Sequence, residues 1–371
     1  MVWKGWLGFI KFRKRVRHGS LFPAFQFISV TNDCNLKCQG CWVYNETVKD
    51  YMEPDRIDSI IVAGKKYGSF FFGILGGEPL MHPHLTSIFS KHSDCYFQLF
   101  TNGTLFTRSL AIKLRETGNV TPLISLEGDE QVADIRRGGH RIYSRTLEAV
   151  RTSVEEGLIT GVAISVCKSN LDMALSDEFV NMLHNLGVLY IWYYIYRPAG
   201  NNPNYELSLN ADEIYSLRKF LVNGRQKFPV ILIDSYWRAN GEPFCPASDG
   251  LSHHINPAGY IEPCPVVQIA RENILQGQVD KIYENSEFLR GFRNEIHHKT
   301  KGCIFMEEPA WLRTFADRQQ AMNSSNRSEY FTDLEKAPLL PSHGSCQIIP
   351  EKNLLYKIAK RTAFFGMGAY G

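Results

Sequence analysis

Short runs of β-branched and aromatic residues alternate along the chain with amphipathic stretches. The runs that predict strands cover residues 25–30, 69–75, 96–100, 122–126, 161–167 and 190–196. Between them, apolar residues recur at helical spacing and predict helices, among them 54–66, 141–156 and 176–186. Regular alternation of this kind favours a parallel sheet with helices on its outside.

Six strand-helix units fit an open barrel better than a closed one of eight units. We therefore expect an α/β fold with a partial (β/α)6 TIM-like barrel. In such barrels the functional groups lie just after the strands. The sequence agrees, because a three-cysteine motif follows the first predicted strand, Gly76-Gly77-Glu78-Pro79 the second and Thr101-Asn102-Gly103 the third.

The pattern changes after a predicted helix at 211–227 and a short strand at 230–233. Residues 236–309 are rich in Pro, Gly, His and Cys with little periodicity, which predicts a loop-rich cap. We expect four regions: a basic aromatic N-terminal segment (1–24), the barrel (25–235), the cap (236–309) and a C-terminal extension (310–371).

Composition predicts a globular protein inside the cell. Of the 371 residues, 44% are hydrophobic, which suffices for a buried core. The sequence has neither a long uncharged apolar run nor a secretory signal, so we expect a cytoplasmic location.

The net charge of +3 is unevenly distributed. Residues 1–32 carry six basic and no acidic residues, which leaves the remainder at −3. This distribution argues against a broad nucleic-acid-binding face, and any anionic partner would be met by the N-terminal segment.

Cys34, Cys38 and Cys41 have the spacing C-x3-C-x2-C. Three thiolates from one tight loop can hold a [4Fe-4S] cluster and leave one iron open to a small chelating molecule. Zinc is the alternative, but it prefers paired C-x2-C motifs with a fourth ligand close by, whereas His18 and His82 are distant in sequence.

This spacing after a first strand resembles the radical S-adenosylmethionine (SAM) superfamily. Its members carry an aromatic residue before the third cysteine, near the adenine of SAM. The present chain has Gly40 at that position and Trp42 just after the motif, so the stacking role would pass to Trp42.

The resemblance implies further SAM contacts. Gly76, Gly77, Glu78 and Pro79 match the family's GGEP motif, which binds the SAM ammonium. Ser125 and Glu127 lie in a segment similar to the family's fourth-strand motif, and Arg137, rather than the adjacent Arg136, matches the arginine that pairs with the SAM carboxylate. Further polar contacts are implied for Asn102, Ser165 and Asn170.

The resemblance also implies the reaction. An electron from a donor such as flavodoxin or ferredoxin reaches the cluster, SAM is cleaved to a 5′-deoxyadenosyl radical, and the radical abstracts hydrogen from a peptide or small-molecule substrate. The sequence singles out no catalytic acid or base.

A second set of cysteines lies in the cap. Cys245 and Cys264 bracket Gly259, and Cys303 follows. The arrangement resembles the SPASM/Twitch extension of radical SAM enzymes, which implies an auxiliary [4Fe-4S] cluster with Cys346 or another group as fourth ligand. Zinc stays open here, because His253 and His254 lie between the cysteines.

The remaining cysteines, Cys95 and Cys167, fall at predicted strands and are expected to be buried apolar residues. Tyr196 and Arg197 end the aromatic sixth strand and are candidate substrate contacts.

Both ends of the chain mix large apolar residues with cations, which favours either packing on the barrel or peripheral membrane contact and a lipid substrate. A non-catalytic iron-sulfur or zinc protein with an anionic partner is the alternative of another class.

Overall fold

The computed structural model describes residues 2–43, 49–201, 203–234, 236–344 and 348–361. The chain divides into two compact units. Unit 1 comprises Met1–Cys34, Trp42–Phe97 and Cys245–Leu339, and unit 2 comprises Asn35–Cys41, Gln98–Phe244 and Leu340–Gly371. Each unit is described by itself below.

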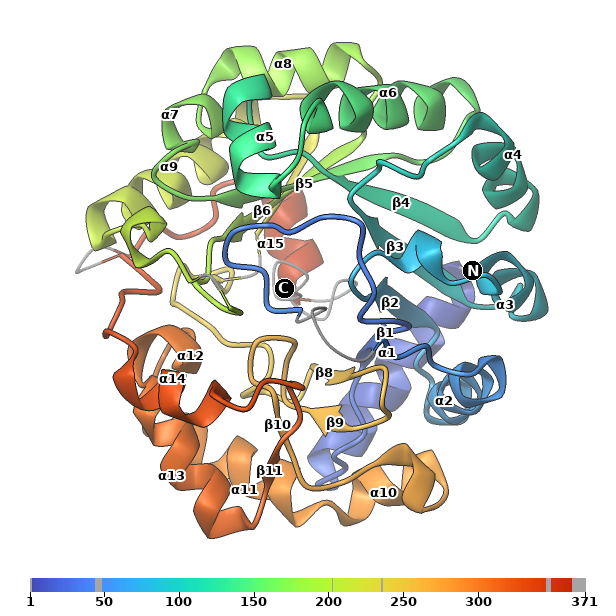
Figure 1. Cartoon of the computed structure of the whole chain (residues 1–371), viewed down its shortest axis with the longest axis vertical. Helices are drawn as coiled ribbons and strands as arrows, with labels where there is room; N and C mark the ends of the chain where they lie inside the picture. Colours follow the sequence, from blue (N-terminus) through green and yellow to red (C-terminus); the bar gives the residue numbers. More distant parts are fainter. Residues whose placement is uncertain (1, 44–48, 202, 235, 345–347, 362–371) are drawn as a thin grey trace. The chain divides into compact units, whose positions relative to one another are not determined.

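Unit 1 contains the first strands and the predicted cap (Figure 1). Its elements are α1 (Val2–Arg17), β1 (Phe25–Ser29), α2 (Pro54–Tyr67), β2 (Phe71–Leu75), the 3-10 helix η1 (Pro79–Met81), α3 (Leu85–Lys91), β8 (Ser252–Ile255), β9 (Ile261–Glu262), β10 (Ile269–Ala270), η3 (Ile274–Gln276), α10 (Val279–Asn285), α11 (Glu287–Ile296), α12 (Ile304–Glu307), α13 (Pro309–Gln319), β11 (Met322–Asn323) and α14 (Tyr330–Lys336).

Unit 2 contains the later barrel strands and their helices. Its elements are α4 (Arg108–Thr117), β4 (Val120–Ser125), α5 (Glu130–Arg137), α6 (Ile142–Glu155), β5 (Gly161–Val166), α7 (Leu171–Ala174), α8 (Asp177–Asn185), β6 (Tyr190–Ile195), η2 (Tyr205–Leu207), α9 (Ala211–Lys227), β7 (Ile231–Asp234) and α15 (Leu354–Arg361). Strand β3 (Tyr96–Thr101) begins in unit 1 and ends in unit 2.

The strands of both units pair in parallel. In unit 1, β1 pairs with β2 on one side and with β8 on the other, and β9 adds to β8 in the antiparallel direction. In unit 2, β4, β5, β6 and β7 pair in parallel in that order, and α4, α6 and α8 lie along one side of them in Figure 1. Parallel pairing requires crossover helices, which is the alternation that the sequence predicts.

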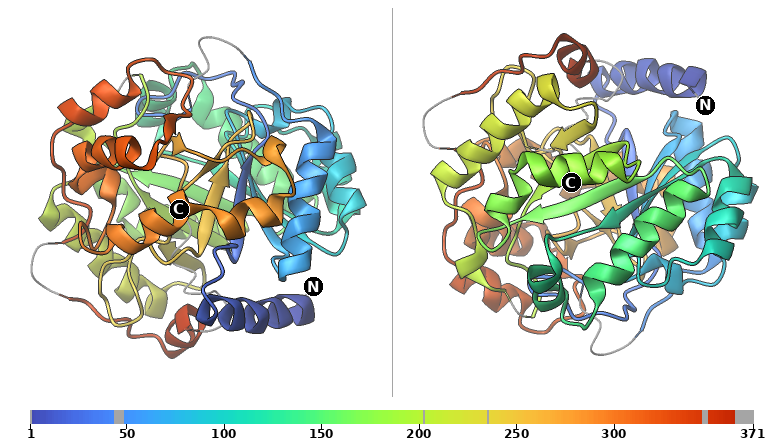
Figure 2. Two further views of the ribbon diagram at one scale, coloured as in Figure 1. Left: turned by 90° about the horizontal axis from the view of Figure 1, so that it is seen from below. Right: turned by 90° about the horizontal axis from the view of Figure 1, so that it is seen from above.

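Helix α2 shows why these segments fold as predicted. Pro54 begins it, Gly68 ends it in the left-handed conformation (φ 82°), and Ile57, Ile60 and Ile61 form its buried face. Helix α1 packs on the end of α2 (Figure 2), where a Cβ on Gly8 would lie 2.2 Å from the carbonyl oxygen of Gly68. The two glycines therefore allow the helices to meet closely.

Strand β8 lies in the predicted loop-rich cap. Its sequence, Ser-His-His-Ile, has no apolar alternation, yet all four residues are buried and the strand pairs in register with β1. Within the strand, His254 finds buried hydrogen-bond partners in Ser29 and Glu262, which local propensity does not encode.

Candidate functional site

The boundary between the two units runs through the first cysteine motif. Cys34 belongs to unit 1, whereas Cys38 and Cys41 belong to unit 2, and all three are partly exposed. The residues that pack against the motif are therefore described separately for each unit.

In unit 1, the GGEP turn after β2 packs against the residues that precede the first cysteine. The amide of Gly77 donates to the carbonyl of Thr31 (2.8 Å), and the amide of Glu78 donates to the carbonyl of Asp33 (2.8 Å). A Cβ on Gly77 would lie 2.2 Å from the Asp33 oxygen, so only glycine permits this approach.

The Glu78 side chain is fully buried at this turn. Its Oε1 accepts a hydrogen bond from the amide of Leu80 (3.0 Å) and caps η1, in which Pro79 is the first residue. Gly76, at φ 154°, lies equally close to the strand end, because a Cβ there would meet the Thr31 oxygen at 2.5 Å. These backbone contacts thus fix the turn beside the start of the cysteine motif.

In unit 2, the end of α5 packs against the middle of the same motif. Gly138 ends α5 at φ 64°, and a Cβ there would lie 2.3 Å from the carbonyl oxygen of Lys37. The amide of Gln39 donates to the carbonyl of Arg136 (2.8 Å). The helix that carries the candidate arginines is therefore fixed to the cysteine loop by its backbone.

Glu127 holds both candidate arginines. Its carboxylate bonds Arg136 through Nη1 (2.5 Å) and Arg137 through Nη2. Arg137 Nη1 lies 3.9 Å from Cys38 Sγ, whereas Arg136 Nη1 donates to the carbonyl of Ser165 (2.8 Å). Arg137 is thus the arginine that reaches the motif, and it supplies a positive charge where a thiolate ligand would need one.

Charge pairing outweighs burial at Arg137. Burial acts to lower the pKa of its guanidinium, but the negative charges of Glu127 and Cys38 hold that pKa above its ordinary value. Arg137 is therefore a permanent cation within unit 2.

Four further predicted residues lie in the same unit. Asn102 Nδ2 donates to Asn35 Oδ1 (2.9 Å) and so holds the residue that follows Cys34. Ser125 ends β4, and the carbonyl of Ser165 accepts from Asn170 Nδ2 (3.0 Å) as well as from the neighbouring arginine. Ser165 thus contacts Arg136 and Asn170 through its backbone carbonyl.

Gly40 and Trp42 lie in different units. The ring of Tyr196 packs directly against Gly40 (φ 68°). A Cβ on Gly40 would lie 2.2 Å from Tyr196 Oη. Trp42 lies in unit 1, where its ring meets that of His254 edge-on at 5.3 Å. An aromatic ring thus adjoins the position before the third cysteine, and it comes from the end of β6. Sequence reasoning named Tyr196 only as a substrate contact, since no sequence rule places a ring from a distant strand at that glycine.

The second cysteine set lies within unit 1. Cys264 opens a turn closed by the amide of Val267, and Cys303 precedes α12. Burial and the neighbouring thiols of Cys264 and Cys303 raise the pKa of Cys245 to about 12. Cys264 and Cys303 therefore act on the same thiol, that of Cys245.

The histidines of the zinc alternative have other contacts. His254 hydrogen-bonds Ser29 and Glu262, and His253 stacks on Tyr283 with ring centroids 5.6 Å apart. Within the described ranges, no three His, Cys, Asp or Glu residues are grouped for a single metal ion. Cys346, the candidate fourth ligand, falls outside the described residues.

Comparison with known families decides the class. The Radical SAM superfamily matches residues 28–174, which run from the strand before the cysteine motif to the helix after Asn170. Residues 28–174 form a radical SAM domain. Radical SAM enzymes bind a [4Fe-4S] cluster and SAM, so the cofactors and the enzymatic nature expected from the sequence are confirmed.

Two relatives of the chain are named for different roles, one as a synthase and one as a maturation protein. The chain is 27% identical to an Fe-coproporphyrin III synthase from Methanosarcina barkeri, over 38% of this chain and 37% of that protein. It is 24% identical to the sporulation killing factor maturation protein SkfB from Bacillus subtilis, over 78% of this chain and 72% of that protein. The second alignment extends well beyond the radical SAM domain.

A solved structure confirms the fold. SuiB from Streptococcus suis, bound to its precursor peptide SuiA, has a TM-score of 0.65 to this chain at 17% identity, covering 76% of this chain and 70% of SuiB. The α/β class and the partial barrel are therefore confirmed. Among the residues that the structure describes, no helix combines the length and the apolar composition that a bilayer crossing requires.

Proposed function

We propose that the chain is a radical SAM enzyme that abstracts hydrogen from a peptide or a small molecule through SAM cleaved at a cluster on Cys34, Cys38 and Cys41. The observation that carries the proposal is the packing around this motif. The GGEP turn adjoins it within unit 1, and the end of α5 with Arg137 adjoins it within unit 2.

Each side of the motif has a defined task in this proposal. When bound, the cluster and SAM supply a 5′-deoxyadenosyl radical by one-electron cleavage. The backbone at Gly76 and Gly77 accepts the SAM ammonium, Glu78 adds a carboxylate, and Arg137 pairs with the SAM carboxylate.

A peptide is the substrate class that we favour. SkfB, named as a maturation protein, matches 78% of the chain, and SuiB, solved with a precursor peptide, matches 76%. The alignment with the Fe-coproporphyrin III synthase is confined to 38% of the chain. We propose that Cys245, Cys264 and Cys303, which lie beyond the radical SAM domain in sequence, hold an auxiliary [4Fe-4S] cluster.

The test is anaerobic reconstitution followed by incubation with dithionite and SAM. We expect 5′-deoxyadenosine by mass spectrometry, and we expect none after replacement of Cys34, Cys38 and Cys41 with Ala. Candidate precursor peptides that raise the yield and gain a mass change would identify the substrate. A protein that holds zinc, or a cluster whose spectrum SAM does not change, would instead support the non-catalytic metal protein.

Peripheral membrane contact is a second proposal, favoured by α15. This helix exposes Leu354, Leu355 and Ile358 at 68%, 75% and 51%. The three side chains recur at helical spacing and form one apolar face. We expect the protein to sediment with vesicles containing phosphatidylglycerol, and L354S/L355S to abolish binding. Leu339→Ser, at a residue that is 70% exposed outside this helix, is the control.

A further inference from the structure

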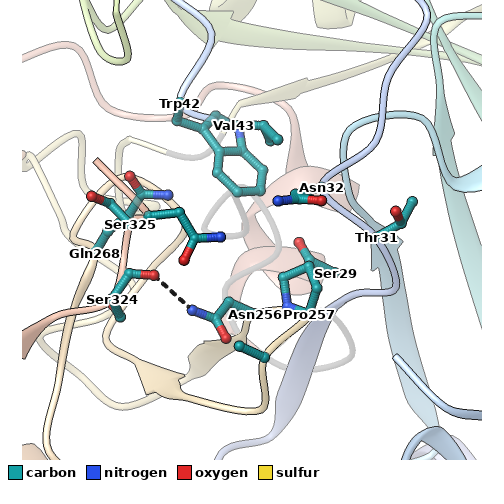
Figure 3. A pocket seen from close by; sticks show the side chains of 12 residues that line it. Ser29, Thr31, Asn32, Trp42, Val43, Asn256, Pro257, Gln268, Ser324 and Ser325 are labelled. Carbon is teal, nitrogen blue, oxygen red and sulfur yellow. Dashed lines mark hydrogen bonds between the residues drawn. The ribbon is translucent and has the colours of Figure 1, made fainter. Parts of the chain in front are cut away.

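A pocket of about 360 Å³, including the open solvent at its mouth, lies within unit 1 (Figure 3). None of its 12 lining side chains is charged. Hydroxyl and carboxamide groups from Ser29, Asn32, Gln268 and Ser325 face the indole of Trp42. Ser29 and Asn32 precede Cys34 in the chain and Trp42 follows Cys41, so residues that flank the cysteine motif in sequence line the pocket.

Ser29 connects this pocket to a buried chain of hydrogen bonds. Its Oγ lies 2.7 Å from Nε2 of His254, and Nδ1 of His254 lies 2.6 Å from Oε2 of Glu262. All three side chains are at most 1% exposed. They come from the neighbouring strands β1, β8 and β9, so the sheet itself fixes their geometry.

The partners of Glu262 set the direction of these bonds. Asn256 Nδ2 (3.0 Å) and the Ser324 hydroxyl (2.6 Å) both donate to its Oε1. A carboxylate that receives three convergent donors accepts from His254 Nδ1–H. His254 Nε2 is then the acceptor for the Ser29 hydroxyl, so the lone pairs of Ser29 remain for a donor in the pocket.

We propose that Ser29 accepts a proton from the substrate during the radical reaction, with His254 as the proton acceptor behind it and Glu262 as a positioning residue. This inference rests on the proposed function. In the step, the substrate proton binds Ser29 Oγ, the hydroxyl proton of Ser29 moves to His254 Nε2, and the electron pair stays on the substrate. Ser, His and a carboxylate at these distances are the arrangement by which enzymes activate a hydroxyl.

The same proton path can be tested without the natural substrate. Diisopropyl fluorophosphate reacts with a serine only if its proton is removed: the Oγ–P bond forms, the P–F bond breaks, fluoride leaves and His254 takes the proton. We expect the reconstituted protein to gain one diisopropylphosphoryl group, located on Ser29 by peptide mass spectrometry.

Variants separate the activated serine from its neighbours. Ser29→Ala abolishes labelling, and His254→Gln slows it by about 100-fold, a typical contribution of a general base. Ser325→Ala is the matched control, because Ser325 lines the same pocket but bonds Asn323 Oδ1 (2.6 Å); it labels at the wild-type rate.

Rescue tests the positioning role. Glu262→Gln slows labelling, and Glu262→Asp restores part of the rate, which a purely structural carboxylate would not require. Absence of label on Ser29, or an equal rate in His254→Gln, overturns the proposal. If Ser29 is labelled but no variant or wild type forms 5′-deoxyadenosine, the relay stands and the proposed function fails.

Discussion

Arg136 and Arg137 are adjacent in sequence, share one carboxylate and yet have different surroundings. Besides Glu127, Arg136 donates a hydrogen bond to the carbonyl of Ser165, whereas Arg137 Nη1 points to Cys38 Sγ. Sequence reasoning chose Arg137 by resemblance alone, and that choice stays a prediction. The contact supplies a physical reason for it.

Replacing Arg137 with Lys should weaken SAM binding by about 10- to 100-fold, since a charge-assisted hydrogen bond contributes about 1.5–3 kcal/mol and lysine cannot reproduce the planar fork. Equilibrium dialysis of SAM against the cluster-containing variant measures the change. Arg136→Lys is the matched control and should keep wild-type affinity. Equal losses in both variants would contradict the assignment.

His253 makes stability depend on pH. Burial, with a smaller contribution from Arg293, lowers its pKa to about 3. The folded protein therefore holds it neutral while the unfolded chain protonates it below its ordinary value, so stability falls as pH drops from 6.5 towards 3. At pH 5 the cost is about 2 kcal/mol. We expect His253→Phe to reduce the difference between urea midpoints at pH 7 and pH 5, and an unchanged difference would refute this account.

At the scale of elements, two close approaches fix the cysteine loop, one in each unit. The GGEP turn is fixed by Gly77 and the end of α5 by Gly138. In both cases a glycine allows one backbone to approach another more closely than a Cβ permits. These approaches, rather than side-chain bonds, set where the motif lies in each unit.

Gly77→Ala should therefore displace the turn and reduce both iron incorporation and SAM cleavage by more than tenfold, because the new Cβ would overlap the Asp33 carbonyl. Iron content and 5′-deoxyadenosine yield measure the effect. Gly277→Ala, where nothing lies within 4 Å of the added carbon, should remain within about twofold of wild type.

A buried ion cluster in unit 2 joins β7, α9 and α15. Asp234 receives Arg218 (3.2 Å), Arg225 and Lys360 (3.0 Å). Burial acts to raise the pKa of Asp234, but the three cations hold it well below its ordinary range. The carboxylate is thus the centre that keeps three buried cations in place.

Replacing Asp234 with Asn removes a counter-charge from Lys360 and leaves Glu351 as the remaining carboxylate beside Arg218 and Arg225, so it should destabilise the protein by about 3–5 kcal/mol in urea unfolding. Asp177→Asn is the control, because Asp177 pairs with Lys227 on the exposed side of α9 and should cost less than about 1 kcal/mol. Similar losses in the two variants would show that burial does not decide the effect.

Across the whole molecule, the sequence predicts those elements whose signals are local. The helix expected at 211–227 is α9, bounded by the capping box of Asn210 and Glu213. The pairing of β8 with β1 was not predicted, because it depends on contacts between distant segments, such as that of His254 with Ser29. The Tyr196 ring at Gly40 and the hydrogen bonds of Ser29 were missed for the same reason. Tertiary contacts between distant segments decide them.

The number of clusters is a property of the whole chain, and the two cysteine sets predict it. All three cysteines of the second set lie within unit 1, where burial and the neighbouring thiols raise the pKa of Cys245. Replacing Cys245, Cys264 and Cys303 with Ala should lower iron from about eight to about four per chain. Reductive SAM cleavage should persist, because the first motif is untouched.

Cys95 and Cys167 provide the control for that experiment. Both are fully buried in the hydrophobic core, so their replacement with Ala should leave the iron content unchanged. Four irons in the wild type together with one zinc that the triple variant loses would assign the second set to zinc. Four irons and no zinc would leave those thiols without a metal and remove the auxiliary cluster. A fall from eight irons to four would show that the enzyme holds two clusters. If SAM cleavage persists in the same variant, only the first cluster is needed for it.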